Sequence, residues 1–248
     1  MTITVFWLPG TGFSSGVDGI SQAFGTALDR QRFEFVPLRY PASYGGLDVA
    51  YGQSVEIGKR VLLDAVRATP NRAVIGGYSQ GAGIAGDVAA EIGRGEHPDV
   101  EVLACALMAD PGRPYGEGCV GLPTASGSGI SGPRLIPGDI YQRTYWAAAE
   151  GDGITALPSG NPLRSIADLS EWYSLRSPGD AHVWAERLRD RAFARRWQRW
   201  WSIENWRSWS GALAYTTGYL TGRHTTAYLT EGLASGLADV VNREVQNG

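Results

Sequence analysis

The chain has few cysteines, few histidines and little excess charge, and these shortages limit the classes of partner and site that it can have. Its 248 residues include two cysteines and three histidines, 19% of residues are charged, and the formal net charge is −3. Such a balance gives no basic surface, so we expect no nucleic-acid partner. No apolar run is long enough to cross a bilayer, and no residues have the spacing of metal ligands. We therefore expect no transmembrane segment, no metal and no cofactor.

The N-terminus and the cysteines bear on where the protein is made. The chain opens with a strand-like run, Ile3–Leu8, and lacks the basic region and cleavage site of a secretory signal. We therefore expect synthesis in a cytoplasm, which favours free thiols. Cys105 lies in an apolar run typical of a core, and the sequence leaves open whether it pairs with Cys119.

The segment Gly77–Gly81 (GYSQG) carries the strongest functional signal in the chain. It fits Gly-x-Ser-x-Gly, the sharp strand-to-helix turn that exposes a serine hydroxyl in α/β-hydrolases. The apolar run 73–76 before it predicts a buried strand, and the small-residue stretch Gln80–Ile92 after it predicts a helix. A Gly-rich loop with an incidental serine would explain the five residues alone, but not this order of strand, turn and helix.

Strand-like runs alternate with helical patterns up to about residue 150, which predicts a mostly parallel sheet with helices on both faces. The expected strands are Ile3–Leu8, Phe33–Leu38, Ala73–Gly77, Val102–Met108 and Tyr141–Ala148. Other expected helices are Val55–Ala68 and, at the C-terminus, Thr230–Val245. We predict a single α/β-hydrolase domain over residues 1–248, with a Trp-rich helical cap inserted over residues 160–220.

A serine hydroxyl needs a base to take its proton, and the chain offers three histidines for that role. The chain order in α/β-hydrolases is nucleophile, acid, histidine. His224 lies in a loop just before the final predicted helix, where this order requires the base. His182, at the start of a predicted cap helix, is the alternative. His97 follows the nucleophile helix so closely that no acid precedes it in the required order.

Asp152 is the predicted acid because it follows the strand expected at 141–148. It lies between two glycines, so its carboxylate can turn toward the sheet edge and orient the imidazole of the base. Glu150 is the nearest rival, although it suits a solvent-facing position. Neither of two further acids follows a late strand. Asp110 ends the strand directly after the nucleophile helix, and Asp139 comes before the strand expected at 141–148.

An acyl-transfer site also needs two backbone N–H groups that stabilise the developing oxyanion. Gln80, at the start of the helix after the nucleophile, supplies one, because free N–H groups gather at a helix N-terminus. Thr11, in the loop after the first strand, is predicted to supply the other. Gly10 and Gly12 let the backbone of that loop approach the substrate, and with Tyr78 they are the predicted substrate-binding residues.

Several motifs point together to one family. They are Pro9–Gly12, Arg39–Ala42, Gly77–Ala82, Ala109–Pro114, Gly129–Pro133, Gly151-Asp152, and the late His224 with Tyr228. This set resembles the cutinase-like serine esterases, and among them the lysin B enzymes of bacteriophages that infect mycobacteria and related actinobacteria. The Trp-rich stretch resembles the corresponding region of the family only in being a helical insertion. Cutinases usually carry a disulfide framework that two cysteines cannot provide, which favours the phage branch.

The resemblance implies a mycolylarabinogalactan esterase, which cleaves the ester between mycolic acids and arabinogalactan during host lysis. It implies a lipid ester as substrate, synthesis in the infected host's cytoplasm without a signal peptide, and action at the cell envelope after release. Tryptophans of residues 160–220 would then contact the long apolar chain, or they would simply pack a small cap. We expect a monomer.

Two alternatives remain open. The first is a general cutinase-like or PE-PPE-type esterase or lipase that acts on other lipids. The second is a non-catalytic module that binds the cell envelope, and the full set of catalytic residue types argues against it.

Overall fold

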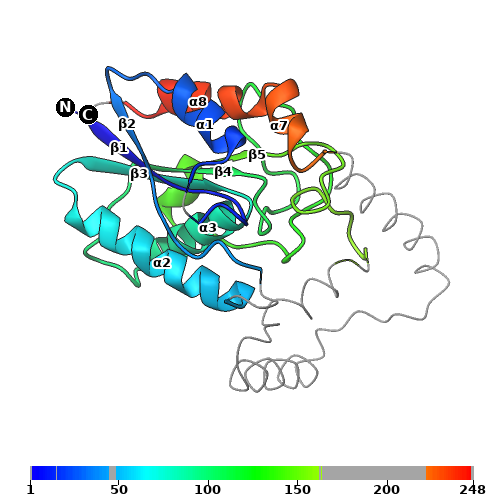
Figure 1. Ribbon diagram of the computed structural model, residues 1–248, viewed down its shortest axis with the longest axis horizontal. Coiled ribbons are helices and arrows are strands. Elements are labelled where there is room, and N and C mark those ends of the chain that lie inside the picture. The colour runs from blue at the N-terminus through cyan, green and yellow to red at the C-terminus, as the bar shows by residue number, and fades with distance from the viewer. Residues whose placement is uncertain (1, 15, 45–48, 162, 164–221, 247–248) are drawn as a thin grey trace.

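Five parallel strands form one sheet with helices on both faces (Figure 1). The computed structural model describes residues 2–14, 16–44, 49–161, 163 and 222–246. The strands are β1 (Ile3–Leu8), β2 (Phe33–Pro37), β3 (Arg72–Tyr78), β4 (Ala104–Met108) and β5 (Thr144–Ala147). Their order in the sheet is β2-β1-β3-β4-β5. The predicted α/β architecture with a parallel sheet is confirmed.

The sheet separates two apolar cores because successive residues of a strand point to opposite faces. In β1, Val5 and Trp7 enter one core, while Phe6 and Leu8 enter the other. The first core is covered by α1 (Gly19–Ala27) and α8 (Leu233–Glu244), and the second by α2 (Tyr51–Ala68) and α3 (Gln80–Gly93) (Figure 1). Burial on both faces explains why β1 reads as a continuous apolar run.

The strand order reverses direction at the centre of the sheet. After β1 the chain adds β2 on one side, and then crosses to add β3 on the other side of β1. Ligands of open parallel sheets bind beyond the carboxyl ends of the strands, where the order reverses in this way. Ser79 directly follows β3 and therefore lies at that position.

Several predicted elements were wrong in their boundaries. α2 begins four residues before the predicted Val55, and β4 begins two residues after the predicted Val102. Residues 141–143, expected in the last strand, belong to a 3-10 helix, η1 (Asp139–Arg143), and β5 starts only at Thr144. Gly138 has a φ of 75°, a conformation that ends an extended run and lets η1 begin. The Thr144 hydroxyl then donates to the Ile140 carbonyl at 2.7 Å, which closes the turn.

The predicted C-terminal helix, Thr230–Val245, begins three residues later than expected, and a short helix that the sequence did not predict precedes it. α7 (Thr226–Thr230) lies directly after His224, and α8 follows after a break at Gly232. Gly232 takes the left-handed conformation, with φ 68° and ψ 19°, which stops one helix and redirects the chain before the next. This break frees α7 to lie near the carboxyl end of the sheet, while α8 packs on α1.

The predicted cap, residues 160–220, falls almost wholly outside the described residues, so its helical nature stays a prediction. None of the described helices combines the length and apolarity that a membrane crossing requires. Cys105 and Cys119 are free thiols, which settles the pairing that the sequence left open.

Candidate active site

Ser79 sits on a sharp turn between β3 and α3. Its φ of 56° and ψ of −117° lie outside the regions that a residue with a Cβ normally occupies. The Ser79 N–H donates to the Met108 carbonyl at 2.9 Å, so the turn stays attached to β4. This is the strained strand-to-helix geometry that the Gly-x-Ser-x-Gly motif predicts.

The glycines on either side of Ser79 are required by close backbone approach. A Cβ on Gly77 would overlap the backbone of Gly81, and a Cβ on Gly81 would overlap the carbonyl of Leu8. Leu8 ends β1, so the missing side chain lets α3 begin directly against the central strands. The two glycines of the motif are therefore needed for close packing, while the serine carries the chemistry.

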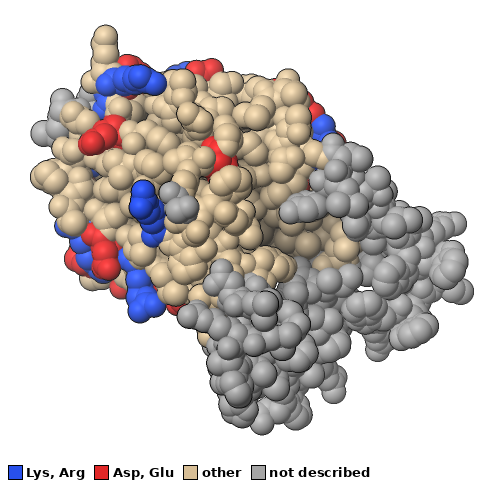
Figure 2. Space-filling model, in the orientation of Figure 1, with Lys and Arg blue, Asp and Glu red and all other residues tan. Residues whose placement is uncertain are grey.

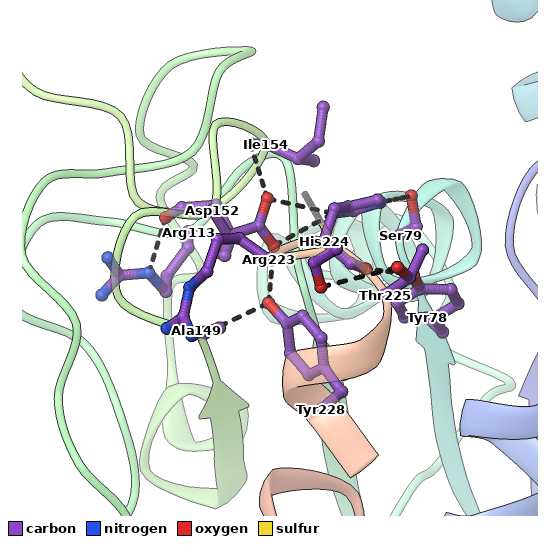
Figure 3. Close-up of polar contacts among 12 residues, drawn as sticks. Tyr78, Ser79, Arg113, Ala149, Asp152, Ile154, Arg223, His224, Thr225 and Tyr228 are labelled. Carbon is purple, nitrogen blue, oxygen red and sulfur yellow. Dashed lines mark hydrogen bonds and ion pairs between the residues drawn. The ribbon is translucent and has the colours of Figure 1, made fainter. Parts of the chain in front are cut away.

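Ser79 and His224 are brought together from distant parts of the chain (Figure 3). The Ser79 Oγ lies 2.9 Å from the His224 Nε2, within hydrogen-bond reach. His224 is 5% exposed, and it precedes α7 at the carboxyl end of the sheet. The imidazole is thus placed to take the proton of the hydroxyl.

Asp152 lies on the other side of the imidazole. Both its carboxylate oxygens are 3.0 Å from the His224 Nδ1, and the carboxylate is fully buried. The Ile154 N–H donates to Oδ1 at 2.9 Å, and the Tyr228 hydroxyl donates to Oδ2 at 2.7 Å. An anion held in this way fixes the tautomer in which Nδ1 carries the proton and Nε2 faces the serine.

The rival candidates lie elsewhere. Asp110 is fully buried and accepts from Arg134 at 2.7 Å and from the Trp146 indole at 3.0 Å, so it is a structural acid. Glu150 is exposed and accepts from the Ser126 N–H at 2.7 Å. His97 lies 3.0 Å from Glu91. Asp139 begins η1, and His182 lies outside the described residues.

The two predicted oxyanion donors have backbone N–H groups that point to no acceptor. Within the described part of the chain, neither the Thr11 nor the Gln80 N–H makes a hydrogen bond. Gln80 as a whole is 1% exposed, and its side chain donates to the Ser43 carbonyl at 2.9 Å, so the side chain is held within the protein. Gln80 thus keeps the position expected for an oxyanion donor.

The loop that carries Thr11 is tied down on both sides. The Tyr40 hydroxyl donates to the Pro9 carbonyl at 2.7 Å, and the Gly12 N–H donates to the Ala42 carbonyl at 2.8 Å. Burial, more than any neighbouring charge, raises the pKa of Tyr40 well above its ordinary value, so the phenol remains a donor. The segment after β2 therefore holds the loop after β1.

The three predicted substrate-binding residues have different environments. Gly12 is exposed, with a φ of 90°, and its contact with a substrate stays a prediction. Gly10 is buried, and a Cβ there would come within 2.8 Å of the Tyr78 ring. Tyr78 is 4% exposed, its ring stacks on His224, and its hydroxyl donates to the His224 carbonyl. We therefore correct the interpretation of Tyr78, which supports the histidine from inside the protein.

Residues that the motifs did not reveal hold the acid and base segments. The Arg223 Nε donates to the Glu150 carbonyl at 2.8 Å, which joins the histidine loop to the aspartate loop. Arg113 is fully buried and donates to five backbone carbonyls between Glu117 and Thr155. Arg113 belongs to the Ala109–Pro114 motif, but the sequence of that motif does not show what the guanidinium binds.

The site as a whole can transfer an acyl group. A hydroxyl, an imidazole and a buried carboxylate lie in a hydrogen-bonded row, beside a helix N-terminus with an unused N–H. Among the described residues, no three His, Cys, Asp or Glu side chains converge as metal ligands would. Such a row is the arrangement that nucleophilic catalysis by general-base activation of serine requires.

The parallel sheet and the strained serine turn define an α/β-hydrolase fold. Comparisons of the sequence with protein-family models and with curated proteins give no match. The structure is similar to the catalytic core domain of acetyl xylan esterase from Trichoderma reesei, with a TM-score of 0.51 and 20% identity over 66% of this chain and 91% of that one. It is also similar to lysin B from Mycobacteriophage D29, with a TM-score of 0.54 and 19% identity over 69% of this chain and 75% of that one.

Proposed function

We propose that this protein is a serine esterase that hydrolyses the ester between mycolic acids and arabinogalactan. The observation that carries the esterase assignment is the row of Ser79, His224 and Asp152 at the carboxyl end of the sheet (Figure 3). In this proposal Ser79 is the nucleophile, His224 the general base and Asp152 the acid that orients it.

The reaction proceeds through an acyl-enzyme. The Ser79 Oγ attacks the ester carbonyl while its proton passes to the His224 Nε2, and the N–H groups of Gln80 and Thr11 stabilise the oxyanion. The imidazolium then returns the proton to the departing alcohol oxygen, and the carbon–oxygen bond of the ester breaks. Asp152 stabilises the transient imidazolium.

Deacylation repeats the same proton transfers with water as the nucleophile. His224 takes a proton from the water, whose oxygen attacks the acyl carbonyl, and the proton then passes to the Ser79 Oγ as the acyl–enzyme bond breaks. The products are a free carboxylic acid and an alcohol, and the enzyme returns to its starting state. Each group in the row is used in both halves of the reaction.

Three observations support a lipid ester as substrate. The motifs resemble lysin B enzymes, and lysin B from Mycobacteriophage D29 shares the fold. On the face drawn in Figure 2, most charged side chains lie toward the end that holds the chain termini, and much of the remaining described surface is uncharged. A long neutral acyl chain suits such a surface better than a polyanion does. Lipid contact through residues 160–220, a monomeric state and action at the envelope after cytoplasmic synthesis belong to the same proposal.

The direct test is release of free mycolic acids from mycolyl-arabinogalactan. We expect release by the wild-type protein and none by Ser79→Ala, because that variant lacks the nucleophile. Thr225→Ala is a matched control: it removes a neighbouring exposed hydroxyl whose one hydrogen bond among the described residues is to the Gly222 carbonyl, so we expect near-normal release. Comparable release by Ser79→Ala and the wild type would sink the assignment.

A second candidate function is a general esterase for smaller or different acyl groups. This candidate is supported by the fold that the protein shares with the acetyl xylan esterase core domain. It predicts strong hydrolysis of a short p-nitrophenyl ester without release of mycolic acids. A non-catalytic envelope-binding module predicts neither activity, and a fluorophosphonate probe would then leave Ser79 unlabelled.

A further inference from the structure

Tyr228 is a buried phenol in direct contact with the predicted catalytic acid. It lies on α7, four positions after His224, and it is fully buried. Its hydroxyl donates to the Asp152 Oδ2 at 2.7 Å, and its oxygen accepts from the Ala149 N–H at 3.2 Å (Figure 3). One side chain thus connects the end of the last strand, the acid and the helix that follows the base.

The direction of these hydrogen bonds is determined by the groups involved. A backbone N–H can only donate, so the phenol oxygen is the acceptor of the bond from Ala149. The single phenol proton is then donated to the Asp152 Oδ2, which accepts this hydrogen bond. Burial, and next the charge of Asp152, raise the pKa of Tyr228 well above its ordinary value, so the phenol keeps this proton.

Asp152 has no solvent to replace this donor. Its side chain is fully buried, and within the described residues its donors are the His224 Nδ1–H, the Ile154 N–H and the Tyr228 hydroxyl. Apart from the histidine, Tyr228 alone among them reaches Oδ2. Loss of the phenol would leave a buried carboxylate oxygen with only the imidazole as partner.

We propose that Tyr228 is a positioning residue for the reaction, which sets both the orientation and the effective charge of Asp152. This inference rests on the proposed esterase function. By donating to Oδ2, the phenol holds the carboxylate plane against Nδ1 and takes up part of its negative charge. The carboxylate then faces the imidazole in a fixed orientation, and its charge sets how readily His224 takes the serine proton.

The test is Tyr228→Phe, which keeps the ring and removes only the hydroxyl. With a short p-nitrophenyl ester we expect kcat/KM to fall about tenfold to a hundredfold, as for loss of a hydrogen bond to a charged group. We also expect the acid limb of the pH profile to move to higher pH, because an undivided charge on Asp152 favours the protonated imidazole. The low-field proton NMR signal of the His224 Nδ1–H should shift in the same variant.

Tyr145→Phe is the matched control, since it removes the hydroxyl of a half-buried tyrosine on β5 that lies outside the site. We expect its kcat/KM, its acid limb and its NMR signal to match the wild type. A fall in kcat/KM for Tyr228→Phe with an unmoved acid limb and an unmoved NMR signal would reduce Tyr228 to a packing role and overturn the proposal. So would an unchanged kcat/KM.

Failure of the proposed function gives a different result. In that case the wild type and Ser79→Ala would have equal activity, and fluorophosphonate would not label the wild type. The NMR comparison of the wild type and Tyr228→Phe still measures the effect of the phenol on the Asp152–His224 pair. An unmoved signal there overturns the positioning role independently of any activity.

Discussion

Ser79 is positioned by the backbone around it, whereas Asp152 and His224 are positioned by side chains from distant parts of the chain. On the nucleophile side, two glycines and a strained turn bring β3 and α3 together within a few residues. On the acid–base side, Tyr228 and Arg223 join segments more than 70 residues apart. The first arrangement is encoded locally and the second depends on the folded domain.

The largest effect should come from Asp152→Asn, on the acid–base side. The amide cannot stabilise the imidazolium or hold the required tautomer, so we expect kcat to fall about 10³- to 10⁴-fold. Steady-state hydrolysis of a short p-nitrophenyl ester measures this. Glu150→Gln is the control, because this rival acid is exposed, and we expect activity close to wild type. Equal losses in the two variants would contradict the assignment of the acid.

Gly81→Ala tests the nucleophile side. The added Cβ would overlap the Leu8 carbonyl, and it could fit only if the start of α3 moved away from β1. We expect the free energy of unfolding to fall by more than about 3 kcal/mol, measured by denaturant titration. Gly19→Ala is the control, since a Cβ there meets no atom within 4 Å. A Gly81→Ala variant as stable as that control would show that the turn tolerates a side chain.

Arg113→Met should have a smaller effect, on the acid–base side. Removal of the guanidinium leaves five carbonyls without their donor, and one of them, that of Thr155, lies in the aspartate loop. We expect a loss of about 2 to 3 kcal/mol in the free energy of unfolding, with reduced activity through a loosened Asp152. Arg94→Met removes an exposed ion pair with Glu96, and thermal unfolding should show little change.

The local features of the molecule could be predicted from the sequence. The apolar runs locate all five strands because both faces of the sheet are buried, and the turn at Ser79 follows from Gly77 and Gly81. The boundary errors at η1 and α8 lie next to a glycine with positive φ, Gly138 before η1 and Gly232 before α8.

The supporting contacts could not be predicted in the same way. Tyr228 and Asp152 are 76 positions apart, and no periodicity in either segment reports their contact. Tyr78, predicted to contact the substrate, is the last residue of β3, and its ring lies in the core beside His224. Only the packed structure reveals that contact.

Ser79 and His224 are 145 positions apart, and this separation also affects how the protein folds. Contacts between such distant residues close large loops, so they form late, after local strands and helices have begun to assemble. A folding intermediate with an intact serine turn would therefore lack the base and hydrolyse nothing. During refolding from denaturant, the return of ester hydrolysis would report completion of the domain more sharply than the return of helical signal.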